Sequence, residues 1–99
     1  MKKVMVPYKV KPDRVGENET LVKAVYEQLH EEKPKGLRYA TFKLADGVSF
    51  VHIAMIEGEN PLANLSAFKT FSAEIKDRCD EPPAPVDLTE VGSYGFFDR

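Results

Sequence analysis

Residues 36–57 read GLRYATFKLADGVSFVHIAMIE, and this stretch decides the fold. Asp46 and Gly47 stand between two runs that are rich in β-forming residues, 37–44 and 48–56. An Asp-Gly pair in that position predicts a hairpin turn of about two to four residues, because the turn needs a positive φ that both residue types tolerate. We therefore expect the stretch to fold as two adjacent antiparallel strands.

The second run is apolar on both of its faces. From residue 50 to residue 56, only His52 has a polar side chain. Strict alternation would leave one face polar, as in a half-solvated sheet, whereas a strand with two apolar faces is normally covered on both sides. We therefore expect the two strands of the hairpin to be central in their sheet.

The composition is that of a single globular domain. The chain has 99 residues, 42% of them hydrophobic and 30% charged, a size that can bury one two-layer core. Its 14 basic and 16 acidic residues give a net charge of −2, which is no footprint for nucleic acid. Cys79 is the single cysteine, so folding needs no oxidising compartment, and no apolar run approaches the roughly 20 residues of a membrane span. We expect a cytoplasmic protein that contacts neither membrane nor nucleic acid.

A strand is expected before the hairpin, over residues 3–10. Its alternate residues Val4, Val6, Tyr8 and Val10 share one face. Pro7 lies on the other face and has no backbone N–H, which predicts an edge strand or a place where the ladder is open.

Two helices and a last strand complete the expected order. Asp13 is a candidate N-cap for a helix that ends near residue 32, before Pro34. A second helix is expected from about residue 62 or 66 to residue 79, with Cys79 in its last turn and Arg78 on its outer, charged side. A long final strand is expected over about residues 86–96.

The order of these elements is β-α-β-β-α-β. This order predicts an α+β, ferredoxin-like domain, in which both helices cover one face of an antiparallel sheet. Two helices cannot cover the second face, although the central hairpin is apolar there too. A second copy of the chain is the simplest cover, so we expect a twofold homodimer.

The sequence resembles the dimeric α/β-barrel superfamily, in particular its small antibiotic-biosynthesis-monooxygenase-like domains. The resemblance lies in four stretches and in their order: YKVKP at residues 8–12, GLRY at 36–39, FVHIAMIE at 50–57 and LSAFKTF at 65–71. It implies one domain over residues 1–99 and a homodimer whose two sheets pack face to face as a barrel. It also implies a pocket in each subunit between sheet and helices.

The resemblance leaves three functions open. The first is a protein of unassigned activity that binds a small hydrophobic or aromatic ligand, or none; the second is a cofactor-independent monooxygenase for an aromatic or quinone-type substrate; the third is a haem-binding or haem-degrading protein. Quinone-forming members of the family use Trp, Asn and Arg, and haem-degrading members use a helical His with Trp and Asn. This chain has no Trp, and residues 66–79 contain no His or Asn. We expect no cofactor.

His52 is the candidate catalytic residue. A neutral imidazole among apolar neighbours can act as a base, a hydrogen-bond donor or a ligand. The alternative is a structural histidine bonded to backbone, tyrosine or carboxylate. No pairing of His, Asp and Glu at metal-binding spacing accompanies His52 or His30, so no metal site is expected.

Five other residues are candidates for the ligand pocket. Tyr39 would orient a ligand; the alternative is an aromatic residue of the core. Arg38 would hold a carboxylate; the alternative is a surface charge. Tyr26, Phe68 and Phe71 form pocket walls in the family arrangement, and otherwise belong to the core.

The remaining side chains of interest are given structural roles. Tyr94, Phe96 and Phe97 are expected at an interface between subunits. Cys79 is expected to be buried and inert, because it is far from a helix N-terminus that would lower its pKa. A cavity beneath the helices, together with the side chains that enter it, is the observation that would separate the three functions.

Overall fold

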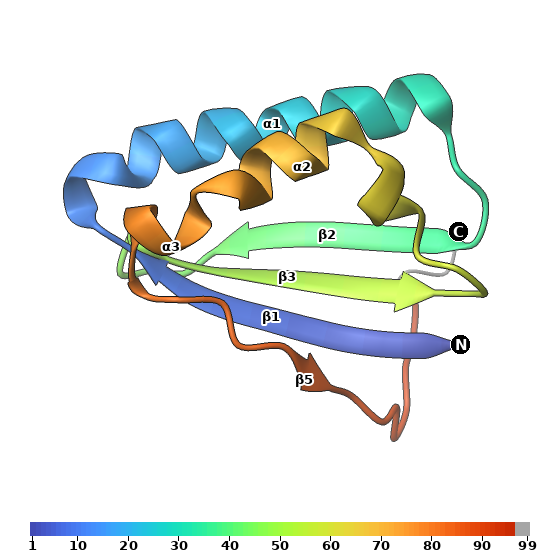
Figure 1. The fold of residues 1–99 in the computed structure, drawn as a ribbon. Helices are drawn as coiled ribbons and strands as arrows, with labels where there is room; N and C mark the ends of the chain where they lie inside the picture. Colours follow the sequence, from blue (N-terminus) through green and yellow to red (C-terminus); the bar gives the residue numbers. More distant parts are fainter. Residues whose placement is uncertain (97–99) are drawn as a thin grey trace.

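Strand β3 (Ser49–Ile56) lies in the middle of the sheet. The structure, a computed structural model, describes residues 1–96. Its other strands are β1 (Lys2–Val10), β2 (Leu37–Lys43), β4 (Cys79–Glu81) and β5 (Val86–Asp87), and its α-helices are α1 (Val15–Glu32), α2 (Ser66–Ala73) and α3 (Ile75–Arg78). The strand order is β2-β3-β1-β4, with β5 also paired to β1, and every pairing is antiparallel. The helices lie on one face of the sheet, which confirms the two-layer α+β, ferredoxin-like fold (Figure 1).

Strand alternation divides the sheet into a helix-facing side and an open side. In β3, Phe50, His52, Ala54 and Ile56 are buried, whereas the residues between them are half-buried. Phe50 packs into the core with Val22 and Val25 of α1 and Phe71 of α2, whereas the other three line a cavity on the same side. A buried site on this sheet would therefore lie on its helix-facing side.

The hairpin forms with the short turn expected at Asp46 and Gly47, which occupies residues 45–48. Gly47 has a φ of 79°, and its N–H donates to the Leu44 carbonyl at 3.0 Å. Asp46 has no positive φ; its carboxylate instead accepts the backbone N–H groups of Val48 and Ser49 at 3.0 and 2.8 Å. The expectation that both strands are central was right for β3 and wrong for β2, because the strands after the hairpin pair with β1 and leave β2 at the edge.

Pro7 lies where the ladder of β1 is open, as expected. It is paired with Val51 of β3 on one side. On the other side, β4 pairs with the end of β1 and β5 with its beginning. Between them, the Pro7 carbonyl accepts the Ala84 N–H at 3.3 Å, so the missing N–H of Pro7 interrupts no regular pairing.

The helix ends also differ from expectation. A 3₁₀ turn at Pro12–Arg14 precedes α1, so Asp13 lies inside that turn and Arg14 occupies the N-cap position without a side-chain cap. The expected Asp13 cap was therefore wrong. The second helix breaks at Glu74, where φ is −127°, and Cys79 begins β4 instead of ending a helix.

Arg78 lies inside the molecule. We expected this arginine on the outer side of one continuous helix, and that was wrong: its side chain is 1% exposed. Arg78 lies seven residues after the buried Phe71, about two helical turns on, so its spacing places it on the same side as Phe71.

The expected last strand is short. β5 spans Val86–Asp87, and Leu88 adds one hydrogen bond to the Lys3 carbonyl, close to where β1 begins. Within the described residues, the tail that follows β5, residues 88–96, forms no strand, and Tyr94 is 99% exposed. Of the three aromatic residues expected at an interface, Phe97 lies outside the described residues.

The open side of the sheet is apolar. Val51, Ile53 and Met55 of β3 lie there, and Phe42 of β2 is 46% exposed. The helices of the described chain leave this side uncovered (Figure 1). None of the helices in residues 1–96 has the length and apolar character needed to cross a bilayer.

Candidate functional site

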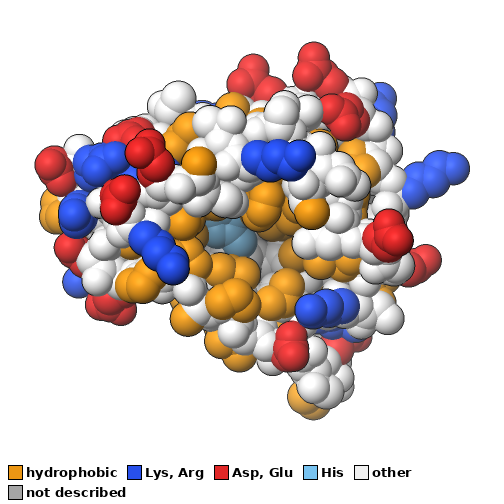
Figure 2. Space-filling model, viewed as in Figure 1, with side chains coloured by type: hydrophobic (Ala, Val, Ile, Leu, Met, Phe, Trp, Pro, Cys, Tyr) orange, Lys and Arg blue, Asp and Glu red, His pale blue; other side chains and the backbone are white. Residues whose placement is uncertain are grey.

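A cavity of about 260 Å³ lies between the helix-facing side of the sheet and the segment that contains α2 and α3. Figure 2 shows it as a hollow with histidine at its floor and hydrophobic side chains around it. Its walls are mostly apolar and include Val4, Val6 and Ala54 from the sheet and Leu62, Phe68 and Phe71 from the helical side. Such a space favours an apolar or aromatic molecule over a charged one.

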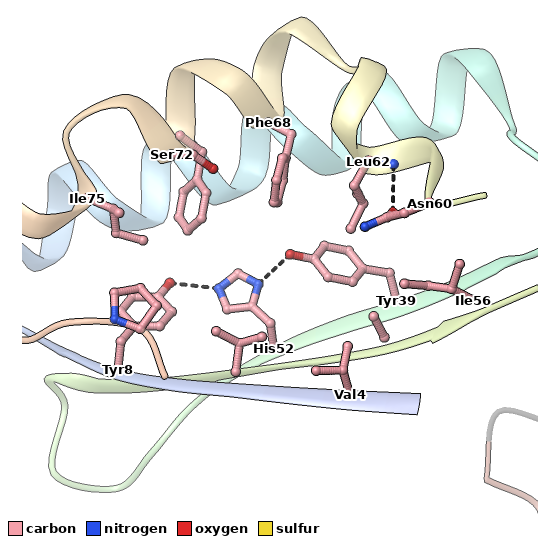
Figure 3. A pocket seen from close by; sticks show the side chains of 14 residues that line it. Val4, Tyr8, Tyr39, His52, Ile56, Asn60, Leu62, Phe68, Ser72 and Ile75 are labelled. Atoms are coloured by element: carbon pink, nitrogen blue, oxygen red, sulfur yellow. Dashed lines mark hydrogen bonds between the residues drawn. The ribbon is translucent and has the colours of Figure 1, made fainter. Parts of the chain in front are cut away.

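His52 lies between two tyrosines at the floor of the cavity (Figure 3). The Tyr8 hydroxyl is 2.7 Å from His52 Nε2, and the Tyr39 hydroxyl is 2.6 Å from Nδ1. Thr41 Oγ1 is 3.0 Å from the same Nδ1. The position of His52 in β3 explains this arrangement, because β1 and β2 flank β3 and present Tyr8 and Tyr39 on the same side of the sheet.

The hydrogen-bond chain continues at both ends. Asn18 of α1 donates from Nδ2 to the Tyr8 hydroxyl at 3.0 Å, and Arg78 donates from Nε to Asn18 Oδ1 at 3.3 Å. At the other end, the hydroxyls of Tyr26 and Thr41 are 2.8 Å apart. Asn18 and Arg78 are 0% and 1% exposed, so the chain runs from the interior of the helical layer across the sheet.

The polar groups that line the cavity are uncharged at neutral pH. Burial lowers the pKa of His52 to about 4, so its imidazole is neutral at pH 7. Burial raises the pKa of Tyr8 to about 12, partly offset by the hydrogen bond from Asn18, and it also raises the pKa of Tyr39. The site therefore offers neutral hydrogen bonds in an apolar space, and its histidine is a weak base.

The structure brings four of the six sequence candidates together at one cavity: His52, Tyr39, Phe68 and Phe71 line it. Tyr26 lies behind Tyr39, with the two rings stacked at 5.4 Å, and supports it from outside the cavity. Arg38 is exposed and pairs with Met55, so it lies on the open side of the sheet, away from the cavity.

Three members of this hydrogen-bond chain were not predicted from the sequence: Asn18, Arg78, and Tyr8 as a site residue. Two of them carried a signal in their spacing. Asn18 precedes the buried Val22 by four residues, which places its amide on the apolar stripe of α1. Arg78 lies seven residues after Phe71, two helical turns on, and its guanidinium lies over the Phe71 ring at 5.3 Å. A polar residue at an apolar position of a helix was the available indication.

Metal ligands do not gather at this site. In the described part of the chain, no group of three or more His, Cys, Asp and Glu side chains is placed to hold a metal ion. The tyrosines and the histidine instead bond to one another. The chemistry that this set offers is hydrogen bonding to a small molecule.

The fold is shared with several solved structures. A protein provisionally named an antibiotic biosynthesis monooxygenase from Nitrosomonas europaea has a TM-score of 0.76 at 21% identity, over 93% of this chain and 100% of that one. Rv0793 from Mycobacterium tuberculosis has a TM-score of 0.74 at 19% identity, over 93% and 96%. SnoaB, a cofactor-independent oxygenase from Streptomyces nogalater, has a TM-score of 0.68 at 12% identity, over 95% and 96%. No family model and no curated protein matches the sequence.

Proposed function

We propose that this chain, which has the fold of antibiotic-biosynthesis-monooxygenase-like proteins, binds a small apolar or aromatic molecule between its sheet and its helices. The observation that carries the proposal is the cavity of about 260 Å³ with apolar walls, at whose floor Tyr8, His52 and Tyr39 converge. A few directed polar groups in an otherwise apolar cavity are typical of small-molecule sites. The volume corresponds to a ligand of one or two rings.

A cofactor-independent monooxygenase is the second candidate. A cavity that holds Tyr39 and His52 together favours it, and SnoaB, with the same fold, is such an oxygenase. In this reaction a phenol and O₂ would give a quinone and water. One atom of the O₂ would enter the quinone and the other would leave as water. His52 would orient the phenol only through Tyr39, because both of its ring nitrogens are already bonded and an imidazole with a pKa of about 4 is a weak base at neutral pH.

The third candidate, haem binding, has less support. The cavity volume is below the roughly 300 Å³ at which pockets for drug-sized ligands begin, and a porphyrin is larger than such ligands. Both ring nitrogens of His52 have hydrogen-bond partners, so neither points into an open slot.

Filling the cavity tests the proposal. Ala54 is 4% exposed and lines the cavity, so the additional atoms in Ala54→Leu occupy space that a ligand would take. Ala40→Leu is the matched control, because Ala40 lies on the open side of β2. Titration of 1-naphthol, followed by tyrosine-ring NMR signals, should show saturable binding to the wild type and Ala40→Leu and at least a tenfold loss for Ala54→Leu. Equal binding by all three proteins would place the ligand elsewhere.

The assembly belongs to the same proposal. A homodimer formed through the open side would cover the exposed Phe42 and complete the cover of Ile53 and Met55, which residues 88–93 of the tail already border. The tail that contains Tyr94 would contribute to that interface. The cytoplasmic location expected from the sequence stays a prediction.

A further inference from the structure

We propose that Arg78 and Asn18 are positioning residues that fix the tautomer of His52, and that they thereby make the Tyr39 hydroxyl the donor to an acceptor oxygen of the ligand. The ligand class is then a small aromatic ketone or quinone. The inference rests on the proposed function for its ligand, but the tautomer can be measured in the ligand-free protein.

The first step is the orientation of Asn18. A guanidinium has only donors, so the amide atom that faces Arg78 Nε must be the oxygen, as the 3.3 Å contact to Oδ1 has it. The same guanidinium is held by a second bond, from Nη2 to the Phe71 carbonyl at 2.8 Å. Arg78 therefore removes the usual ambiguity of an amide side chain, and Nδ2 is turned toward Tyr8.

The second step is the direction of the bond between Tyr8 and His52. An amide nitrogen only donates, so the Tyr8 oxygen accepts from Asn18 Nδ2 at 3.0 Å. The Tyr8 hydroxyl retains its own proton, and His52 Nε2 at 2.7 Å is the acceptor that the described contacts provide for it. If Nε2 carried the proton instead, Tyr8 would accept twice and its proton would lack a partner in a residue that is 4% exposed.

The third step concerns Tyr39. A neutral imidazole carries one proton, so an accepting Nε2 places that proton on Nδ1. Nδ1–H then donates to the Tyr39 oxygen at 2.6 Å, with Thr41 Oγ1 at 3.0 Å as a second acceptor. Tyr39 thus accepts from His52 and keeps its own proton to donate. Thr41 competes for that proton but already bonds to Tyr26, whereas a ligand oxygen in the cavity would be a free acceptor.

The hydrogen-bond directions set the ligand class. Tyr39 lines the cavity and presents a donor, while Tyr8 donates its proton to His52 Nε2 and His52 donates its Nδ1 proton to Tyr39. A carbonyl oxygen would satisfy Tyr39, whereas an isosteric hydrocarbon would leave its hydroxyl without that bond. The cost of a missing neutral hydrogen bond corresponds to roughly a threefold to tenfold loss of affinity.

The substitution Asn18→Asp should reverse the directions of these hydrogen bonds, and it therefore provides the test. A carboxylate only accepts, so it would still bond to Arg78 but would take the proton of Tyr8. Nε2–H would then donate to the Tyr8 oxygen, and Nδ1 would accept the proton of Tyr39. Asn64→Asp is the matched control, because Asn64 is exposed and the change adds the same charge.

The tautomer is read from long-range ¹H–¹⁵N correlation spectra of the ligand-free protein at neutral pH. In the wild type and Asn64→Asp, we expect His52 to be protonated at Nδ1, and in Asn18→Asp at Nε2. Protonation at Nε2 in the wild type would overturn the proposal, and so would an unchanged tautomer in a folded Asn18→Asp protein. A merely structural role of Arg78 and Asn18 would alter stability without exchanging the protonated nitrogen.

A pair of isosteric probes tests the ligand class. Acetophenone and α-methylstyrene differ only in an oxygen and a methylene group. We expect the wild type to prefer acetophenone by roughly threefold to tenfold and Asn18→Asp to bind the two about equally. Equal affinities in the wild type would overturn the role of Tyr39. If neither probe bound, the proposed ligand site would fail, while the tautomer measurement would still decide the role of Arg78 and Asn18.

Discussion

His52 should make the free energy of unfolding fall as the pH falls, and the substitution His52→Gln should remove this dependence. The pKa of His52 is lowered from 6.5 to about 4 by burial. Between these values the unfolded chain binds a proton that the folded protein does not, so stability falls as pH falls. This contribution is fully present above about pH 6.5 and is lost progressively down to about pH 4.

The magnitude follows from the size of the shift. The difference between 6.5 and about 4 is about 2.5 pKa units, which at about 1.36 kcal/mol per unit is about 3 kcal/mol in the limit. Between about pH 7.5 and about pH 4.5, most of this difference is expressed, about 2–3 kcal/mol. The variant also loses bonds to Tyr8 and Tyr39, which we expect to lower its stability at neutral pH by about 1–3 kcal/mol.

Urea unfolding at the two pH values, at one protein concentration, measures this effect. The wild type should lose about 2–3 kcal/mol more than His52→Gln on acidification. His30→Gln is the control, because it removes an exposed imidazole and should follow the wild type. Parallel losses in the wild type and His52→Gln would refute the reasoning, since His52 would then titrate alike in the folded and unfolded states.

Three further predictions concern the fold and the assembly. Gly36→Ala should destabilise the protein by about 1–3 kcal/mol in urea unfolding, because Gly36 has a φ of 78° and a Cβ would lie 2.7 Å from the Glu57 carbonyl oxygen. Gly47→Val should cost about 1–2 kcal/mol at a φ of 79°, although no atom lies within 4 Å of a Cβ there; unchanged stability would contradict the turn geometry. Ile53→Lys should convert a dimer into monomers in sedimentation, and a wild type that sediments as a monomer at micromolar concentration would remove the proposed interface.

Most of the fold followed from local sequence patterns. The Asp-Gly turn, the apolar run around His52 and the alternation in β1 act between near neighbours, so the sequence predicts them directly. The unusual position of Pro7 was likewise predictable, because a missing N–H must lie where a ladder is open. Two of the errors occurred where the partner of a segment decides its structure: β2 became an edge, and the last strand ended where β1 begins.

The site was predictable only in part, for the same reason. His52 and Tyr39 were identifiable as an isolated imidazole and an aromatic residue beside it in the hairpin. Arg78 was assigned to the surface because arginine is rarely buried, although its spacing from the buried Phe71 places it on the inner side of the helix. Asn18 and Tyr8 are distant from His52 in sequence, and their bonds depend on how α1 packs on β1 and β3.

A crystal structure with acetophenone would test most directly whether the cavity is a ligand site. We expect the aromatic ring in the cavity against Phe68, with the ketone oxygen at a hydrogen-bond distance of roughly 2.5–3.0 Å from the Tyr39 hydroxyl. Tyr8 should remain bonded to His52 Nε2. Acetophenone bound only on the open side of the sheet, or in the cavity with its oxygen turned away from Tyr39, would contradict the account.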